Sequence, residues 1–218
     1  MEKTVERAIK RYLKKHFPNE WKTIVNKAHE LYPELMSKAP DIGGKENILA
    51  NNLNMFILVI AYYEASGHRI DGTAIDEMLD DIYNRYKWLG AFLNLNRRCT
   101  LSMMQKKLYK SYREYARKVK EKQSRGEWRE TWGMVVDPLN DPTCFNFTLV
   151  GCPLAEYAKK YGYTELMPHM CALDHKYAKV LHTRLIRTHT VAAGAESCDY
   201  RYVPDKNEFA KNYKGKIV

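Results

Sequence analysis

The sequence predicts an α+β fold, with helices in the first part of the chain and a small antiparallel sheet in the second. Apolar residues recur with the 3.6-residue period of helices up to Gly126, and several later segments alternate with the two-residue period of strands. Helices followed by mostly adjacent strands favour a sheet of three to four strands with two covering helices. We expect residues 1–218 to form a single domain, helical over about 1–126 and α+β over about 127–218.

Five helices are expected in the first part. The amphipathic first segment ends before Pro18, and Gly67 suits the end of the apolar third helix. Either Asp71 or Thr73 can cap the fourth helix. The expected helical ranges are 2–17, 20–36, 46–66, 74–87 and 101–123.

The second part alternates between strand and helix patterns. Phe145, Phe147 and Leu149 occupy one side of a strand pattern, and a turn or bulge is expected around Gly194. The expected strands are 128–137, 144–152, 184–191 and 197–203, and the expected helices are 154–161 and 165–180.

The net charge of +10 raises the possibility of a nucleic-acid partner, but the distribution of charge argues against it. The basic excess lies at Lys3–Lys15 and Lys106–Arg129, at helical spacing with acids interleaved, as on solvated helix faces. No zinc-finger spacing or RNA-binding motif accompanies it. We therefore expect no nucleic-acid partner, although a positive field would help to attract a small anionic substrate.

Targeting and redox features point to the cytoplasm. The longest apolar run, Met55–Tyr63, is too short to span a membrane, and the charged first segment lacks the apolar core of a signal peptide. The five cysteines do not show the spacing of a disulfide framework, so we expect thiols. We expect no membrane partner, and the sequence does not indicate the oligomeric state.

Two stretches, Cys152–His175 and Arg187–Tyr202, contain three of the five cysteines and are the candidate site. On a helix, Cys171, Asp174 and His175 share one face because they are three and four residues apart. Such a trio could transfer protons, activate a thiol or bind a metal. The alternative is structural, with Cys171 in the core, Asp174 capping a helix or paired with lysine, and His175 on the surface.

The second stretch adds candidates on a strand. Cys198 shares a strand face with Tyr200, whereas Asp199 points to the opposite face. Arg187 could bind a carboxylate in bidentate fashion or pair with Asp199 across strands. Cys152 directly precedes a predicted helix, whose N–H groups would favour its thiolate. For the two cysteines, simple burial is the alternative.

A metal ion is the less favoured interpretation of the same residues. The stretches supply enough ligand types for zinc: His169, Cys171, Asp174, His175 and Cys198. Their spacing, however, contains neither CxxC nor HExxH. We therefore predict no cofactor, with a bound metal as the alternative.

At these residues the chain resembles the L-2-amino-thiazoline-4-carboxylic acid hydrolase family. The resemblance covers roughly residues 40–202 and includes the loop PDIGGKEN and the segments CPLAEYAKKYGYTEL, MCALDH and RTHTVAAGAESCDYRY. The matching positions are Cys152, Pro153, Glu156, Cys171, Asp174, Arg187, Thr188, Gly194, Cys198 and Asp199.

The resemblance implies hydrolytic opening of a small cyclic amidine, with N-carbamoyl-cysteine as the product of the family's named reaction. Asp174 would then transfer protons, Cys171 or Cys198 would form a covalent adduct, and an arginine, Arg187 or Arg201, would hold the substrate carboxylate.

We therefore expect a cytoplasmic hydrolase that opens a small, anionic cyclic amidine or cyclic amide. The predicted catalytic residues are Asp174, Cys171 and Cys198, and the predicted substrate-binding residues are Arg187, Asp199, Cys152 and Tyr200. The competing class is a small-molecule or metal-binding sensor that uses the same residues without turnover.

Overall fold

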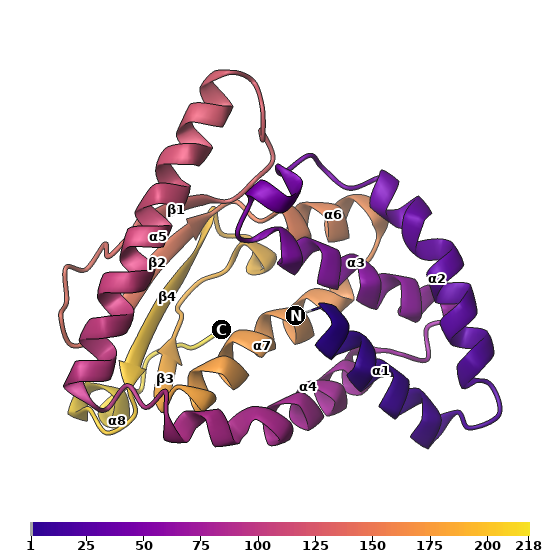
Figure 1. Ribbon diagram of the computed structural model, residues 1–218, viewed down its shortest axis with the longest axis horizontal. Helices are drawn as coiled ribbons and strands as arrows, with labels where there is room; N and C mark the ends of the chain where they lie inside the picture. Colours follow the sequence, from indigo (N-terminus) through magenta and orange to yellow (C-terminus); the bar gives the residue numbers. More distant parts are fainter. Residues whose placement is uncertain (1) are drawn as a thin grey trace. The chain divides into compact units, whose positions relative to one another are not determined.

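The computed structural model describes residues 2–218 and has the predicted α+β fold (Figure 1). Over this range it contains eight α-helices, most of them before the sheet, and one four-stranded antiparallel sheet. The helices are α1 (Glu2–His16), α2 (Trp21–Ser37), α3 (Ala50–Ala65), α4 (Gly72–Tyr86), α5 (Arg98–Ser124), α6 (Pro153–Tyr161), α7 (Met167–Val180) and α8 (Glu208–Asn212). The strands are β1 (Gly133–Val136), β2 (Phe145–Val150), β3 (Thr183–Ile186) and β4 (Ser197–Pro204).

The described chain divides into two compact units. Unit 1 comprises the described residues up to Pro40, together with Gly44–Arg85 and Leu154–Leu173. Unit 2 comprises Asp41–Gly43, Tyr86–Pro153 and Asp174–Val218. Four short 3-10 helices complete the secondary structure: η1 (Gly44–Glu46), η2 (Lys87–Ala91), η3 (Thr164–Leu166) and η4 (Val191–Ala193).

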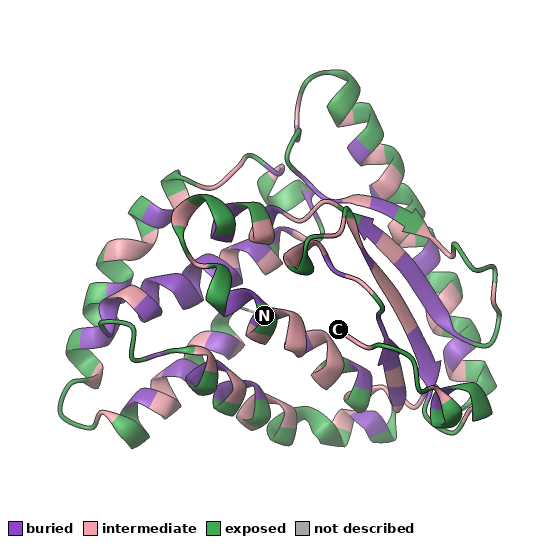
Figure 2. Ribbon diagram, turned by 180° about the vertical axis from the view of Figure 1, so that it is seen from behind, coloured by how far each residue is buried: buried purple, intermediate pink, exposed green. Residues whose placement is uncertain are grey.

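Unit 1 is organised around α3, which packs against α1 and α2. The apolar run predicted to be buried lies on this helix, and Figure 2 shows burial along most of its length. The next helix, α4, begins at Gly72, two residues before its predicted start, and Asp71 caps it as predicted: the Asp71 carboxylate accepts a hydrogen bond from the Ala74 backbone N–H at 3.0 Å. No helix within residues 2–218 is both long enough and apolar enough to cross a membrane.

Unit 2 contains the sheet, with strand order β1-β2-β4-β3 and antiparallel pairing throughout. The register places Phe147 opposite Tyr200 and Leu149 opposite Cys198. Because side chains alternate along a strand, these four residues share one face of the sheet, whereas Asp199 and the residue after Tyr200 point to the other. The two faces carry different polar networks, as described below.

Two strands are shorter than predicted. The first begins at Gly133 rather than at Trp128, because Trp128 has a positive φ of 50° and its carbonyl accepts a turn hydrogen bond from Thr131 N–H. The third ends at Ile186, because the next backbone N–H groups donate to the Asp199 side chain instead of pairing with β4. The prediction of a strand over 184–191 is therefore wrong beyond Ile186.

Candidate functional site

Asp174 forms the centre of the candidate site in unit 2. It lies in the second half of α7, and its Oδ2 accepts a hydrogen bond of 2.7 Å from Nη1 of Arg187, the residue directly after β3. The Arg187 side chain is only 1% exposed, whereas that of Asp174 is 30% exposed. The arginine is thus locked in the interior, and the carboxylate reaches the surface.

The second donor to Asp174 is the Tyr200 hydroxyl, 3.3 Å from the same oxygen, Oδ2. The guanidinium of Arg187 also lies over the Tyr200 ring, 5.4 Å from its centre. The Tyr200 ring in turn stacks on Phe147, with 4.6 Å between ring centres. Both hydrogen bonds therefore end on one carboxylate oxygen, and within residues 2–218 no hydrogen bond ends on Oδ1 of Asp174.

The surroundings of Asp174 are rich in tyrosine. Burial first, and the negative charge of Asp174 second, raise the pKa of four tyrosines in α5, α7 and β4: Tyr112, Tyr177, Tyr200 and Tyr202. An electrostatic interaction with all four places the carboxylate against the aromatic face of the sheet. At neutral pH these tyrosines are therefore uncharged hydrogen-bond donors.

The environment of Asp174 favours its protonated form more than water does. Burial raises the pKa of the Asp174 carboxyl, and the charge of Arg187, the bond from Arg187 and the Tyr200 hydroxyl oppose that rise. A carboxyl with a raised pKa and one oxygen without a protein donor can both accept and return a proton.

Cys198 is buried on the same sheet face. Its sulfur accepts a hydrogen bond of 3.3 Å from the Val191 backbone N–H. Burial raises the pKa of the Cys198 thiol to about 11, and the nearby Cys152 sulfur adds to the rise. Cys198 is therefore a thiol and not a thiolate at neutral pH, although it interacts electrostatically with Arg187 and Asp174.

Asp199 lies on the strand face predicted for it, but its partners differ from the one that was considered. Its carboxylate accepts hydrogen bonds from the backbone N–H groups of Thr188 and His189 and from the Thr188 hydroxyl, at 2.8 to 3.0 Å. The expected cross-strand pair of Asp199 with Arg187 is wrong, because Arg187 points to the opposite face and pairs with Asp174. Asp199 instead holds the segment that follows Arg187.

The two remaining cysteine candidates lie in different units. Cys152 lies in unit 2 directly before α6 and is half-buried. Cys171 lies on α7 within unit 1 and is half-buried there. All five cysteines are outside disulfides, as predicted. His175, which we left outside the predicted site, donates through Nε2 to the Val218 backbone oxygen at 3.2 Å.

The Val218 contact is the feature that sequence reasoning missed. Nε of Arg187 donates to the same Val218 oxygen at 2.9 Å, and Val218 N–H donates back to the Arg187 carbonyl at 2.9 Å. No periodicity or motif connects positions 175, 187 and 218, because their proximity depends on how the chain folds back after α8 (Figure 1).

The opposite face of the sheet carries a second aspartate–arginine pair. Nη2 of Arg201 donates to Oδ2 of Asp141 at 2.8 Å, and Arg201 lies over the Phe209 ring of α8. The other oxygen of Asp141 accepts from the backbone N–H and hydroxyl of Thr143 at 2.9 and 2.6 Å. The buried Cys144 thiol also donates to Oδ2, so both oxygens of Asp141 are occupied.

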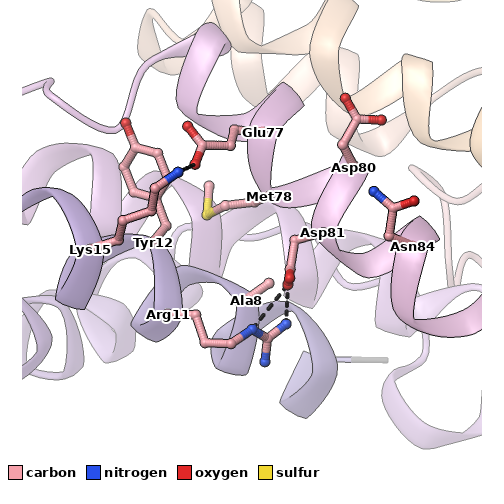
Figure 3. A pocket seen from close by; sticks show the side chains of 9 residues that line it. All are labelled: Ala8, Arg11, Tyr12, Lys15, Glu77, Met78, Asp80, Asp81 and Asn84. Carbon is pink, nitrogen blue, oxygen red and sulfur yellow. Dashed lines mark hydrogen bonds and ion pairs between the residues drawn. The ribbon is translucent and has the colours of Figure 1, made fainter.

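Two cavities lie away from these networks. One, of about 350 Å³, lies in unit 1 between α1 and α4, where Arg11 pairs with Asp81 and Lys15 with Glu77 (Figure 3). The other, of about 650 Å³, lies in unit 2 beside the start of α5 and is lined in part by Arg98 and Lys206. None of the predicted site residues lines either cavity.

Within residues 2–218, no group of three or more histidine, cysteine, aspartate or glutamate side chains is arranged to hold a metal ion.

The protein is a hydrolase that acts on C–N bonds other than peptide bonds, since this is the class defined by the family model that matches the chain. That model describes L-2-amino-thiazoline-4-carboxylic acid hydrolase and matches residues 51–202, more than two thirds of the chain. The chain belongs to this family. The match begins at Asn51, so the loop at 40–47 that we included in the resemblance lies outside it. No curated protein and no solved structure matched the chain.

Proposed function

We propose that this hydrolase opens a small cyclic amidine or cyclic amide similar to L-2-amino-thiazoline-4-carboxylate, with Asp174 as the acid–base group. One observation carries the proposal: Asp174 is held at Oδ2 by Arg187 and Tyr200, while its Oδ1 has no hydrogen bond from residues 2–218. A carboxylate fixed through one oxygen can present the other to a bound molecule.

The reaction can be written with Asp174 as the only proton carrier. The oxygen of water bonds to the ring carbon between the two nitrogens and the sulfur, while one water proton passes to Asp174 and from there to the ring nitrogen. The carbon–sulfur bond then breaks with its electron pair on sulfur. The remaining hydroxyl proton reaches that sulfur through the same carboxyl, and the product is a urea, N-carbamoyl-cysteine for the thiazoline acid.

Attack by water agrees better with the thiol chemistry than attack by Cys198. A pKa of about 11 leaves the Cys198 thiol protonated at neutral pH, and a protonated thiol is a weak nucleophile. The predicted covalent roles of Cys198 and Cys171 are therefore the alternative mechanism. In the favoured mechanism Cys198 packs against the reaction centre.

The other predicted residues are assigned to binding and positioning. Arg187 fixes Asp174 and supplies positive charge for an anionic substrate, and Tyr200 donates a hydroxyl beside the reacting oxygen. Asp199 anchors the backbone directly after Arg187 and so positions it. Cys152, within electrostatic reach of Cys198, is proposed to border the same site.

The test is turnover of L-2-amino-thiazoline-4-carboxylate by the purified chain, followed by detection of the urea product and of its thiol. The proposal expects multiple turnovers by the wild-type chain and no detectable turnover by Asp174→Asn. A folded Asp174→Asn chain with wild-type activity would remove Asp174 from the mechanism. A wild-type chain that binds the ring acid without forming product would favour the sensor interpretation.

A further inference from the structure

Residues 213–218 follow α8 and return to the candidate site, where Val218 bonds with Arg187 and His175. Two side chains from different elements thus meet at one oxygen: Nε of Arg187 at 2.9 Å and Nε2 of His175 at 3.2 Å. His175 comes from α7, next to Asp174, and Arg187 comes from the end of β3.

We infer that Nε of Arg187 and Nε2 of His175 form a subsite for a carboxylate oxygen of the substrate, and that the Val218 oxygen occupies it as an internal ligand. The inference rests on the proposed function and adds a residue, His175, and a segment, 213–218, to it. The two donors that hold the Val218 oxygen can also hold a carboxylate oxygen, and the charge of the guanidinium strengthens a hydrogen bond to an anionic acceptor.

The geometry places this subsite beside the proposed reacting group. The guanidinium of Arg187 uses Nη1 for Asp174 and Nε for Val218, so one side chain bridges the two oxygens. If the carboxylate of a ring replaced the Val218 oxygen, the same guanidinium would therefore bind both that carboxylate and Asp174.

Residues 214–218 are held to the part of unit 2 before Tyr213 through Val218. Its N–H donates to the Arg187 carbonyl, and its oxygen accepts from Arg187 and His175. The Tyr213 hydroxyl donates to the Lys216 backbone oxygen, and the Tyr213 ring packs against Phe209 and the Arg184 guanidinium. A substrate carboxylate competing for the two donors thus has few contacts to displace.

The consequence for binding follows from competition. While Val218 occupies the subsite, only the fraction of molecules with the segment released can accept a carboxylate, and the apparent affinity falls by that fraction. A ligand without a carboxylate does not need the subsite. The segment therefore weakens binding of acids selectively and acts as a specificity element.

The direct test is a methyl NMR titration of the wild-type chain labelled at valine. The probes are L-2-amino-thiazoline-4-carboxylate and 2-amino-thiazoline, which lacks the carboxylate. We expect the acid, and not the neutral ring, to move the Val218 methyl signals towards the positions of an unstructured segment. Val218 signals that stay in place at saturating acid, or that move equally with both rings, would overturn the inference.

Kinetics on variants give a second readout. Deletion of residues 214–218 should lower KM for the acid by roughly ten-fold and leave KM for the neutral ring unchanged. Val218→Pro removes the N–H donor without shortening the chain and should act in the same direction, which covers a deletion variant that fails to fold. An unchanged or raised KM for the acid in both variants contradicts the inference.

His175 is tested with a conservative pair. His175→Gln keeps a nitrogen donor and should retain most of the affinity for the acid, whereas His175→Ala should lose it. Failure of the two proposals can be told apart. Displacement of Val218 without turnover supports the subsite and contradicts the proposed reaction. Turnover without displacement supports the proposed reaction and contradicts the subsite. An acid that is neither turned over nor displaces Val218 overturns both.

Discussion

The two faces of the sheet carry the same pair of residue types and use them differently. On one face Asp174 pairs with Arg187, and on the other Asp141 pairs with Arg201, at 2.7 and 2.8 Å. Asp141 accepts donors on both oxygens, whereas the bonds to Asp174 end on one. A buried cysteine whose pKa is raised to about 11 accompanies each pair.

The pKa values of the two carboxyls shift in opposite directions. Burial raises the pKa of both, but at Asp141 the hydrogen bonds from Thr143, Arg201 and Cys144 outweigh it and hold the pKa at about 2. At Asp174 burial outweighs the arginine and the tyrosine, and the pKa is raised. The number of donors to each carboxylate, rather than the presence of an arginine, thus separates the two pairs.

The largest expected difference is in catalysis. Asp174→Asn should lower kcat by about 10²- to 10⁴-fold, the usual contribution of a general acid–base group, whereas Asp141→Asn should change it less than about three-fold. Steady-state assays on both variants, with circular dichroism to confirm folding, check this. Equal losses in the two variants would mean that either pair acts only through the fold.

Replacement of each arginine by lysine should give the next largest difference. Arg187→Lys keeps a charge but loses the Nε donor and the planar fork, so kcat/KM for an acidic ring should fall by about 10- to 100-fold, mostly through KM. Arg201→Lys should leave kcat/KM nearly unchanged, because Arg201 lies on the opposite face of the sheet. A similar fall in both variants would contradict the division between the faces.

The cysteines offer a matched test of the mechanism. If water is the nucleophile, Cys198→Ala and Cys144→Ala should each cost stability, about 1 kcal/mol, and Cys198→Ala should retain turnover within about ten-fold. Mass spectrometry of the wild-type chain during turnover should show no adduct. A Cys198→Ala chain without activity, together with an adduct on Cys198, would establish the covalent route.

The smallest effects are on stability against acid. The folded pKa of Asp141 is below its ordinary value of 3.8, so its contribution is present above pH 3.8 and is lost as the pH falls towards about 2. After allowance for solvent screening, this contribution is about 1–2 kcal/mol. Urea unfolding of Asp141→Asn should thus show a stability loss at pH 6 that disappears near pH 2.

Asp174 should show the opposite dependence. Its folded pKa is raised, so the stability it contributes is present below pH 3.8 and is lost as the pH rises through the folded value. The stability that Asp174→Asn loses relative to the wild type should therefore be smaller at neutral pH than in acid. A loss for Asp174→Asn that follows the pattern of Asp141→Asn would contradict the contrast between the pairs.

Periodicity was sufficient to predict much of the fold. The helices α1 to α7, the four strands along the chain and the face shared by Cys198 and Tyr200 follow from alternation and helix-end residues, which act locally. Helix α8 and the order of the strands in the sheet were not predicted. The early end of β3 could not be predicted, because it depends on backbone groups donating to Asp199 eleven residues later. Local sequence patterns do not show that a distant side chain will compete with the neighbouring strand for backbone N–H groups.

The contacts among the candidate residues could not be predicted from the sequence. Asp174 was identified by its spacing from Cys171, but its partner, Arg187, lies thirteen residues away on another element. The same pattern did not distinguish Asp174 from Asp199, and only the count of hydrogen bonds on each carboxylate does. His175 was left outside the predicted site, and its contact with the backbone of Val218 could not be predicted from local spacing.

Titration of the two carboxyls by carbon-13 NMR, alongside the pH dependence of kcat/KM, tests the central contrast most directly. We expect Asp141 to titrate near 2, Asp174 to titrate above its ordinary 3.8, and activity to rise with the deprotonation of Asp174. Tyr200→Phe removes a donor that lowers the pKa of Asp174 and should move both the titration and the activity limb to higher pH. An Asp174 midpoint at or below 3.8, or an activity limb that does not follow it, would contradict the assignment of Asp174 as the reacting carboxyl.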